Sequence, residues 1–575
     1  MTNYRLRRVF SFLFCLLLAA PGLPQTKPRS DAETVWVEKT LKSLTLRQKL
    51  GQMIIVAVNG EFAHADSDKY ADIRKQINEL QVGGVIVSWG GPHEVAALTN
   101  ELQRASKLPL FVAADFERGL RMRLRNGTPF TTAMGVGASG DPQAAYRQGK
   151  ILAQEMRSIG VNWLYGPVAD INNNPDNPVI NIRSYGANPQ RVAEFVAAAV
   201  RGVREGGALA TLKHFPGHGD TATDSHLGLP VQMFDRKRLD AVELVPFRAG
   251  LAAGADSVMT AHIALPNITG DNLPATLNPK ISTDLLRREL GFDGIIVTDS
   301  LGMKAITDNY PNGGAAAQAV KAGADVALLP PDPKAALDAL EKAVKAGEIT
   351  EERINQSVRR LLRAKYRLGL ANNRFVDLNA VNRLIEKPEN VREANATAER
   401  SITLLRNKDN LLPLAAERAN RALFIVLAAD DDAEEGRALS PEILRRAPRA
   451  RIAKADPRTT PEEYAKILMD AQNAETIIIA PFVKRAALKG TVALPENQAR
   501  FVLQLLALKK PTGIVAFGSP YLIRQFPDAP VYAVAYAIEE VAQYAAARAM
   551  FGETPFAGKF PVSIPGLFEV GAGSK

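Results

Sequence analysis

The chain has 575 residues, of which 46% are hydrophobic and 23% are charged. This composition is typical of a soluble globular protein, and the length is too great for one ordinary core, so we expect two large domains. The net charge of +10 comes from basic residues dispersed along the chain without interleaved aromatics. That pattern gives little support to a nucleic-acid partner, whereas an anionic envelope polymer is compatible with it.

The first 25 residues are predicted to be a secretory signal peptide. Three arginines precede the apolar run 9–20, which a Pro-Gly pair ends, and this is the order of a signal's basic and apolar regions. The run is too short to span a membrane comfortably. The single cysteine, Cys15, lacks the small residues before it that a lipoprotein cleavage site requires. We therefore expect a periplasmic or extracellular protein without disulfides and without stable membrane insertion once the signal is removed.

Between residues 32 and 375, short apolar runs alternate with polar loops and amphipathic helices. The eight runs are 53–58, 85–87, 110–114, 163–168, 209–212, 258–261, 295–298 and 326–329. Near-continuous hydrophobic strands indicate a parallel sheet that is covered on both faces. Eight such units predict an α/β fold with a TIM (β/α)8-like barrel, closed by helices at 333–346 and 351–370.

A second α/β domain is predicted at 401–575, after a polar, irregular connecting segment at 376–400. Its apolar runs are 423–427, 476–480, 513–517 and 531–537. Helices are expected at 462–473 and 496–509, and a final edge strand at 558–562. This pattern predicts an open, mostly parallel sheet with helices on both faces.

The segment 213–226 holds three of the six histidines of the chain, together with two aspartates and a lysine. It follows the apolar run 209–212, and one proline and two glycines within it prevent a helix. We therefore expect a loop dense in ionisable groups at the C-terminal end of a strand. Parallel α/β folds place their active sites at that end.

Three interpretations of this loop are open. In the first, it is a polar loop in which Lys213 and His214 are held by hydrogen bonds and perform no chemistry. In the second, it binds a metal through donors among His214, His218, Asp220, Asp224 and His226. A His-x-x-x-His pair normally needs a helix to bring both rings to one face, and the Pro-Gly between these histidines removes that support.

In the third interpretation, Asp224 and His226 form an acid/base pair. In an extended Asp-Ser-His segment both side chains point to the same face. Asp224 would then hold one ring N–H of His226 and leave the other nitrogen for a substrate.

Charged side chains also follow most of the other predicted barrel strands. They are Asp115 after the third, Asp170 after the fourth, Lys213 and His214 after the fifth, His262 after the sixth and Asp299 after the seventh. A barrel keeps its site at this rim. Asp299 is either the N-cap of the next helix or a nucleophile that forms a covalent intermediate, as a retaining glycosidase requires.

These motifs resemble those of glycoside hydrolase family 3, in particular its exo-β-N-acetylglucosaminidase branch. The matching segments are 166–170, 181–186, 213–219 running into 224–226, 259–262, 297–303 and 401–414. The resemblance covers nearly the whole chain after the signal. The Asp-Ser-His ending separates this branch from the β-glucosidases of the family, which typically take a glutamate acid/base from the second domain.

The resemblance implies Asp299 as nucleophile, His226 as acid/base and Asp224 as the partner of His226. The residues implied as contacts to the sugar in the −1 subsite are Asp115, Arg123, Arg183, Lys213 and His214. The family usually has Asp-x-Glu-Gly-Gly after the third strand, whereas here Arg118 replaces a glycine. That replacement affects the loop that carries Arg123.

The implied substrate is a terminal, non-reducing β-linked N-acetylglucosamine of cell-wall muropeptides or chitin fragments, and no metal or other cofactor is needed. A role in peptidoglycan turnover is therefore one expectation. The alternatives are a β-N-acetylglucosaminide phosphorylase, a β-glucosidase of the same family and a non-catalytic envelope glycan-binding protein.

Overall fold

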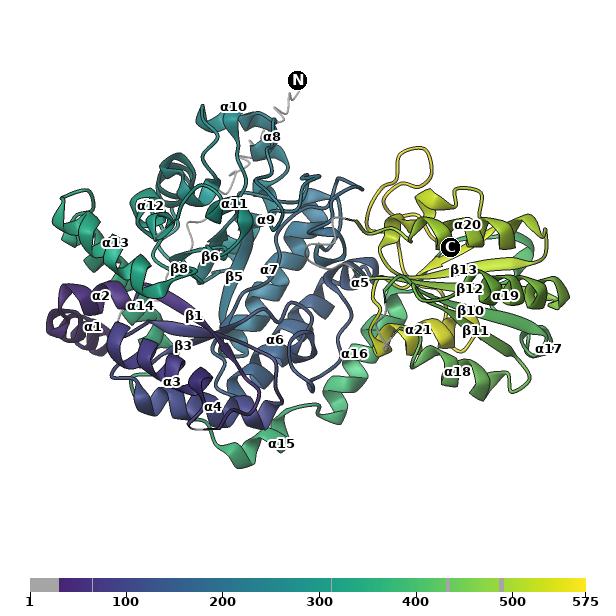
Figure 1. The fold of residues 1–575 in the computed structure, drawn as a ribbon, viewed down its shortest axis with the longest axis horizontal. Coiled ribbons are helices and arrows are strands. Elements are labelled where there is room, and N and C mark those ends of the chain that lie inside the picture. Colours follow the sequence, from purple (N-terminus) through teal and green to yellow (C-terminus); the bar gives the residue numbers. More distant parts are fainter. Residues whose placement is uncertain (1–29, 65, 312, 431–434, 485–490, 575) are drawn as a thin grey trace, which may run out of the picture.

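The structure is a computed structural model that describes residues 30–64, 66–311, 313–430, 435–484 and 491–574. It consists of a barrel and a second α/β domain that lie side by side, with helix α16 (Pro388–Ser401) between them (Figure 1). The predicted signal peptide lies outside the described residues. Within these ranges, no helix has the length and apolar character needed to cross a membrane.

Eight parallel strands form the barrel, as predicted. They are β1 (Ile54–Asn59), β2 (Gly84–Ser88), β3 (Phe111–Ala114), β4 (Trp163–Leu164), β5 (Leu209–Phe215), β6 (Ser257–Thr260), β7 (Ile295–Thr298) and β8 (Ala327–Leu328). The hydrogen-bonded order runs β7-β6-β5-β4-β3-β2-β1-β8. A bridge between Val297 and Val326 joins β7 to the chain entering β8, so the barrel is nearly closed.

The fifth strand is longer than the sequence predicted. β5 continues to Phe215, so Lys213 and His214 lie in the strand and not in a loop. Both side chains are buried. Their burial is tolerated because Lys213 binds Asp115 and His214 binds Asp170, at the ends of neighbouring strands. The loop proper begins at Pro216.

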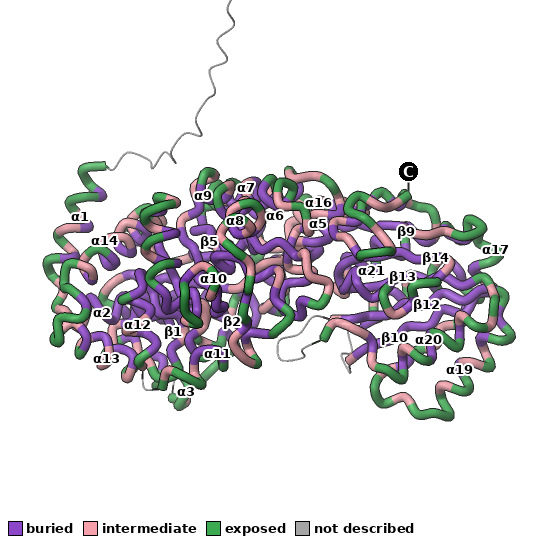
Figure 2. Tube along the Cα trace, turned by 90° about the horizontal axis from the view of Figure 1, so that it is seen from above, coloured by how far each residue is buried: buried purple, intermediate pink, exposed green. Residues whose placement is uncertain are grey.

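Helices surround this barrel. Their bounds are α1 (Asp31–Ser43), α2 (Leu46–Gly51), α3 (Asp68–Lys75), α4 (Pro92–Ala105), α5 (Ala133–Ala138), α6 (Pro142–Ser158), α7 (Pro189–Glu205), α8 (Arg236–Ala241), α9 (Leu244–Ala252), α10 (Pro266–Thr269), α11 (Lys304–Thr307), α12 (Gly314–Ala322), α13 (Pro333–Lys345) and α14 (Glu351–Arg367), with a π-helical stretch at Lys280–Glu289. In α14, Thr350 caps the first turn and Ile354, Val358 and Leu361 recur at helical spacing and are buried. Figure 2 shows the resulting buried strands inside a ring of helices whose outer faces are exposed.

Aromatic side chains of β3 and β4 and the residue after β4 pack together in the barrel domain. Trp163 packs edge-on against Phe111 and Tyr165, with ring centroids 4.9 and 5.4 Å apart. Its indole Nε1–H donates to the hydroxyls of Thr211 (2.8 Å) and Ser257 (3.0 Å). A fully buried tryptophan therefore keeps its one polar group satisfied, as a well-packed core requires.

The second domain holds a six-stranded sheet. Its strands are β9 (Thr403–Asn407), β10 (Ala422–Ala428), β11 (Arg451–Ala455), β12 (Thr476–Val483), β13 (Thr512–Gly518) and β14 (Val531–Val534), in the order β11-β10-β12-β13-β14-β9. β9 is antiparallel to β14, and the other pairs are parallel. The helices of this half are α15 (Val381–Leu384), α16, α17 (Ala416–Ala419), α18 (Leu439–Arg446), α19 (Pro461–Asn473), α20 (Glu496–Ala507) and α21 (Glu540–Met550).

Three predictions for this half of the chain were wrong or incomplete. Segment 558–562 forms no strand, because β9 occupies that sheet edge, and its backbone bonds instead to Ala138, Ala187 and Ala572. The connecting segment is helical, since α16 buries one face against α5 and α21. Sequence reasoning also missed β9 and β11; β11 is an edge strand with an exposed Arg451 and Lys454 and so carries no apolar run.

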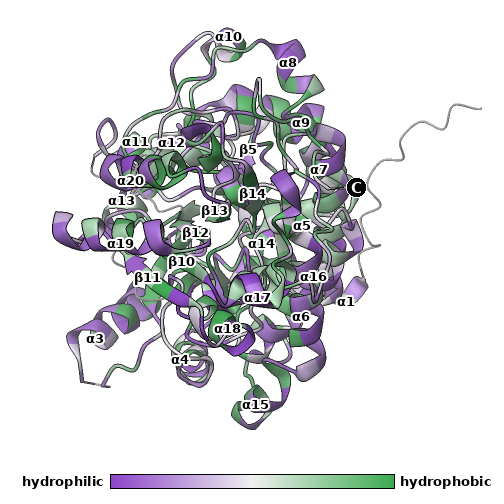
Figure 3. Ribbon diagram, turned by 90° about the vertical axis from the view of Figure 1, so that its right-hand side faces the viewer, coloured by the Kyte–Doolittle hydropathy of each residue, from purple (hydrophilic) through white to green (hydrophobic). Residues whose placement is uncertain are grey.

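The two domains share apolar packing. Residues of β10 alternate between the two faces of its sheet, with Phe424 and Val426 in one cluster and Leu423, Ile425 and Leu427 in the other. The second cluster also includes Met134 and Ala138 of α5 in the barrel domain. Figure 3 shows the hydrophobic strands of this domain inside helices with hydrophilic outer faces. The barrel mouth is therefore held at a defined place against the second domain.

Asp325 lies just before β8, where the barrel closes against β7. This fully buried carboxylate accepts from Ile296 N–H (2.9 Å) on β7 and pairs with Arg287, Arg353 and Arg360. Burial opposes its ionisation, but the three arginines lower its pKa.

We expect Asp325→Asn to lower the free energy of unfolding by about 3–5 kcal/mol, because it removes the fully buried charge that three partly buried arginines share. Urea unfolding followed by tryptophan fluorescence measures this, since all three tryptophans lie in the barrel domain. Asp338→Asn, which breaks an exposed pair with Arg47, should cost about 1 kcal/mol or less. Because the native pKa is lowered, the advantage of the wild type should be full above about pH 4 and shrink as the pH falls below it; equal losses in the two variants would contradict this account.

Candidate active site

A pocket of about 1170 Å³ opens at the C-terminal ends of the barrel strands and is closed on one side by the second domain. Seven of the sequence-predicted site residues line it: Asp115, Arg123, Arg183, Lys213, His214, His226 and Asp299. The eighth, Asp224, is buried directly behind His226. Side chains that are up to 184 positions apart in the chain (Asp115 and Asp299) thus meet at one rim.

Asp224 and His226 form the predicted pair, but in a turn and not in extended chain, because the backbone N–H groups of Leu227 and Gly228 donate to the carbonyl oxygen of Asp224. One carboxylate oxygen of Asp224 accepts from the ring Nδ1 of His226 at 2.7 Å and from the backbone N–H of His226 at 2.9 Å. The Asp224 side chain is 1% exposed, whereas that of His226 is 35% exposed. Nδ1 therefore carries the proton toward Asp224, and Nε2 is left for a ligand in the pocket.

Asp299 lies immediately after β7 and does not cap a helix. The next helix, α11, begins at Lys304 with Met303 before it. Ser300 N–H instead donates to Asp299 Oδ1 at 2.7 Å. Burial opposes ionisation of Asp299, but the neighbouring His214, His262 and Lys213, together with that hydrogen bond, lower its pKa to about 2. Asp299 is therefore a carboxylate at neutral pH, as a nucleophile must be.

A compact set of four charges occupies the rim beside β5. Lys213 Nζ lies 2.8 Å from Asp115 and 2.7 Å from Glu117. Arg183 donates to Glu117 through two nitrogens, at 2.6 and 2.8 Å. Burial opposes ionisation of Glu117, but Arg183 and Lys213 hold its pKa well below the usual range. For Lys213, burial is outweighed by Asp115 and Glu117, which raise its pKa.

Sequence reasoning missed Glu117 as a site residue. It was visible only as the second acid of the Asp-x-Glu segment, and nothing local showed that it joins Lys213 and Arg183. Arg123 lies at the edge of the set, with Nη2 3.9 Å from Asp115.

Asp170 organises the backbone at the end of β5. This buried carboxylate accepts from His214 Nδ1 (2.7 Å) and from the backbone N–H groups of His214 and His218. Burial opposes its ionisation, but the neighbouring His214 and His218 lower its pKa. Arg183 Nη2 lies 3.2 Å from the other ring nitrogen of His214. The arrangement fixes the ring of His214 at the pocket floor.

His218 connects the Asp224–His226 loop to this framework. The Thr221 hydroxyl donates to the carbonyl oxygen of His218 (3.1 Å) and therefore accepts from its Nδ1–H (2.7 Å). Nε2 is then the acceptor for the hydroxyl of Ser225, at 3.1 Å, between the two members of the pair. Burial, with the charge of His214, lowers the pKa of His218 to about 4, so the ring is neutral at neutral pH.

The second domain contributes one wall of the pocket through ion pairs that the sequence did not reveal. Arg118, the residue that replaces a glycine of the family pattern, lies 2.6 Å from Glu539. Arg121 pairs with Glu540. Both acids belong to the start of α21 or the residue before it, so the barrel loop after β3 is tied to the second domain.

Each candidate metal donor of the 213–226 segment is hydrogen-bonded or ion-paired to a different protein side chain. His214 binds Asp170, His218 binds Thr221 and Ser225, His226 binds Asp224, and Asp220 pairs with Arg238. Over the residues that the structure describes, no three His, Cys, Asp or Glu side chains come together in a way that could hold a metal ion.

Both domains match models of one protein family. Residues 45–364 match the glycosyl hydrolase family 3 N terminal domain, and residues 402–569 match the glycosyl hydrolase family 3 C-terminal domain. A β-N-acetylglucosaminidase/β-glucosidase of Cellulomonas fimi is 27% identical over 92% of this chain and 96% of its own.

Two solved structures are also similar over nearly the whole chain. A glycoside hydrolase family 3 β-N-acetylglucosaminidase from Paenibacillus sp. str. FPU-7 is 36% identical, with a TM-score of 0.81, over 91% of this chain and 99% of that one. The β-glucoside phosphorylase BglX is 27% identical, with a TM-score of 0.83, over 93% of this chain and 97% of that one.

The contacts of His218 predict that it holds the loop of Asp224 and His226 in place. We expect His218→Ala to lower the free energy of local opening by about 2 kcal/mol, because two buried hydrogen bonds of the ring are lost. Backbone amides of residues 217–228 should then exchange with solvent deuterium roughly 30-fold faster.

The matched control is His262→Ala. His262 is also a buried rim histidine, but it bonds to Thr276 and the carbonyl of Ser300. This variant should loosen the segment after β7 and leave 217–228 unchanged. Equal acceleration of 217–228 in both variants would mean that His218 has no specific role in that loop.

Proposed function

Because the chain belongs to glycoside hydrolase family 3, we propose that it is a retaining exo-β-N-acetylglucosaminidase that acts through a covalent glycosyl-enzyme intermediate. The observation that carries this proposal is the Asp224–His226 pair, joined at 2.7 Å, beside Asp299 in one pocket. We further propose that the substrate is a cell-wall muropeptide or a chitin-type fragment. The basic and apolar pattern of residues 1–25 supports export to the periplasm or beyond.

In the first step, Asp299 attacks the anomeric carbon of the terminal sugar. Ser300 N–H holds Oδ1, and we assign the attack to Oδ2. As the bond to the leaving oxygen breaks, that oxygen takes the proton from Nε2 of a doubly protonated His226. The products are a glycosyl ester on Asp299, the released alcohol and a neutral His226. Asp224 stabilises the charged ring before transfer and keeps the proton of Nδ1 in place.

The second step reverses these roles. Nε2 of the neutral His226 removes a proton from water as the water oxygen attacks the anomeric carbon, which frees the Asp299 carboxylate. Two displacements at one carbon return the original β configuration. The low pKa of Asp299, about 2, makes it a stable anion before attack and a competent leaving group in this step.

The second-domain wall supports His226, and not a glutamate, as the acid. Of the described residues of that wall, three are carboxylic acids: Glu442, Glu539 and Glu540. Each is paired with an arginine, namely Arg446, Arg118 and Arg121. The hydrogen bonds from Arg446 and Arg445 lower the pKa of Glu442, and a carboxylate whose oxygen is occupied by an arginine is poorly placed to give a proton to a leaving group. This pattern favours the N-acetylglucosaminidase branch over the β-glucosidases.

The charge set of Lys213, Asp115, Glu117 and Arg183 supplies the donors and acceptors that a sugar needs. The Asp115 side chain is 27% exposed at the pocket, whereas those of Lys213 and Glu117 are 3% and 8% exposed. Such pre-ordered groups hold hydroxyls of one ring without having to reorganise on binding. We assign them to the −1 subsite, where the terminal sugar is bound.

Phosphorolysis is the second candidate function, because the β-glucoside phosphorylase BglX is similar over nearly the whole chain. A histidine acid/base also repels an incoming phosphate less than a carboxylate does. In that case phosphate, and not water, would attack the glycosyl ester and give a sugar phosphate.

The specificity of the enzyme tests the proposed function. We expect kcat/KM for an aryl β-N-acetylglucosaminide to exceed that for the aryl β-glucoside by roughly 10⁴-fold, since a site that hydrogen-bonds the acetamido group leaves polar groups unpaired without it. Both substrates are assayed with and without phosphate, and the product is identified. Comparable rates on the two glycosides would indicate a β-glucosidase, and a sugar phosphate product would indicate the phosphorylase.

The roles of His226 and Asp299 are separable by leaving group. We expect His226→Ala to lower kcat/KM by about 10²- to 10⁴-fold for a disaccharide, whose leaving oxygen needs a proton. The loss should be much smaller for a dinitrophenyl glycoside, which needs none.

Asp299→Ala is the matched comparison, because the nucleophile is required whatever the leaving group. It should nearly abolish turnover of both substrates, and in the wild type a slow fluoro-sugar should label Asp299 in a tryptic peptide. Equal losses on both substrates in His226→Ala, or a label on another residue, would contradict these assignments.

A further inference from the structure

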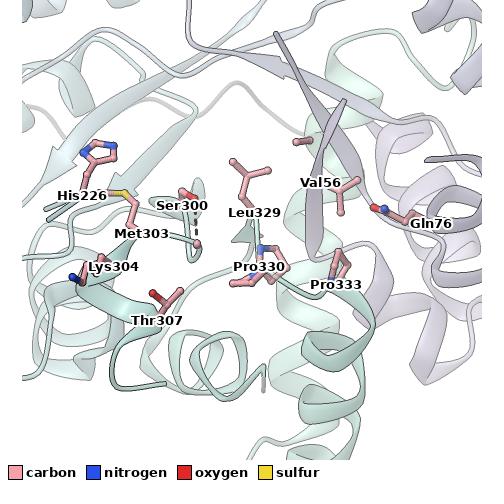
Figure 4. A pocket seen from close by; sticks show the side chains of 13 residues that line it. Val56, Gln76, His226, Ser300, Met303, Lys304, Thr307, Leu329, Pro330 and Pro333 are labelled. Carbon is pink, nitrogen blue, oxygen red and sulfur yellow. Dashed lines mark hydrogen bonds between the residues drawn. The ribbon is translucent and has the colours of Figure 1, made fainter. Parts of the chain in front are cut away.

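A second pocket, of about 650 Å³, lies next to the first. Figure 4 shows its walls, which come from β1, from the segment between β7 and α11, and from the residues after β8. It shares three residues with the first pocket: His226, Ser300 and Leu329. Asp299, Asp115 and Lys213 line only the first.

This division places the second pocket on the leaving-group side of the bond to be cut. A general acid protonates the oxygen that joins the retained sugar to the leaving group, so it stands at the boundary between them. His226 is the acid of the proposed function, and it borders both pockets. The first pocket, which holds the nucleophile and the charge set, takes the terminal sugar, and the second receives what departs.

The lining of the second pocket defines what it accepts. Met303, Leu329, Pro330 and Pro333 give an apolar surface (Figure 4), which suits the C–H face of a pyranose ring. None of its lining residues is an aspartate or a glutamate, and Lys304 is the one lysine or arginine among them.

Lys304 is available to a ligand. The residue is exposed, and Nζ forms no ion pair within the ranges of the chain that the structure describes. A nearby anion would gain a charge-assisted contact without displacing a protein partner. By contrast, Arg118 and Arg121, on the opposite side of the cleft, are already paired with glutamates.

We propose that the second pocket is the leaving-group subsite and that Lys304 selects a leaving sugar that bears a carboxylate. The inference rests on the proposed function and deepens it. Of its two substrate classes, it favours the muropeptide type, whose second sugar carries a lactyl carboxylate, over neutral chitin fragments.

The experiment compares three disaccharides with the same non-reducing N-acetylglucosamine. One ends in N-acetylmuramic acid, the second in its methyl ester, and the third is neutral diacetylchitobiose. The acid and its ester differ in the charge of the lactyl group and by one methyl group. Their ratio of kcat/KM, measured on one preparation, is independent of the fraction of active enzyme. We expect the wild type to prefer the acid by about fivefold at low salt, with a smaller preference at high salt, as a partly exposed charge contact gives.

Two substitutions assign that preference to Lys304. Lys304→Met should bring the acid-to-ester ratio close to one, and Lys304→Glu should reverse it. Arg121→Met, which removes a cation of the barrel loop after β3 from the first pocket, should leave the ratio as in the wild type. A wild-type ratio near one, a ratio that Lys304→Met does not change, or one that Arg121→Met abolishes would overturn the proposal.

The failure of this inference is distinguishable from that of the proposed function. If the function is wrong, diacetylchitobiose and the aryl N-acetylglucosaminide are not hydrolysed, and the inference falls with it. If only the inference is wrong, both are hydrolysed and the acid-to-ester ratio does not respond to Lys304.

Discussion

The site depends on the pairing of charges at the buried end of β5. Lys213 and Glu117 lie where the barrel excludes water, and an unpaired ion there would cost several kcal/mol. Each is matched: Lys213 by Asp115 and Glu117, and Glu117 by Arg183 as well. These contacts hold side chains from three different strand ends in one geometry. The sugar hydroxyls of the proposed substrate would meet a site already ordered before binding.

The same principle extends from these ions to the catalytic pair. Asp170 fixes His214 and the backbone of His218, His218 fixes Ser225, and Ser225 lies between Asp224 and His226. The loop of the proposed acid/base is thus tied to the Asp170 carboxylate through the neutral ring of His218, while the proposed −1 subsite is held through ion pairs. The neutrality of His218, with a pKa of about 4, means that this connection is unaffected by titration near neutral pH.

The second domain acts on the pocket without supplying the proposed chemistry. Its apolar face shares packing with α5, and Arg118 and Arg121 tie the loop after β3 to Glu539 and Glu540. In the proposed function, proton transfer is left to His226. His226 lines both the charged pocket and the more apolar one. In the proposed function, this one residue therefore stands between the site of the retained sugar and that of the leaving group.

The sequence by itself determined what depends on neighbouring residues. The eight barrel strands and four of the second-domain strands follow from apolar runs. The Asp224–His226 pair was expected from extended chain, and it forms in a turn, where Asp224 also accepts from the backbone N–H of His226. The convergence of Asp115, Lys213 and Asp299 follows from the rule that parallel strands end at one rim. These are short-range or fold-class properties, and one chain is enough to read them.

Only the tertiary structure decided which charges pair and which surfaces meet. Glu117 joins Lys213 and Arg183, which lie 96 and 66 residues away, and Arg118 finds Glu539 in another domain. Segment 558–562 has a strand-like pattern, but β9 takes its place at the sheet edge. The pocket that contains Lys304 exists because the ends of β1, β7 and β8 lie together. Such contacts depend on long-range geometry, which no local pattern of residue types encodes.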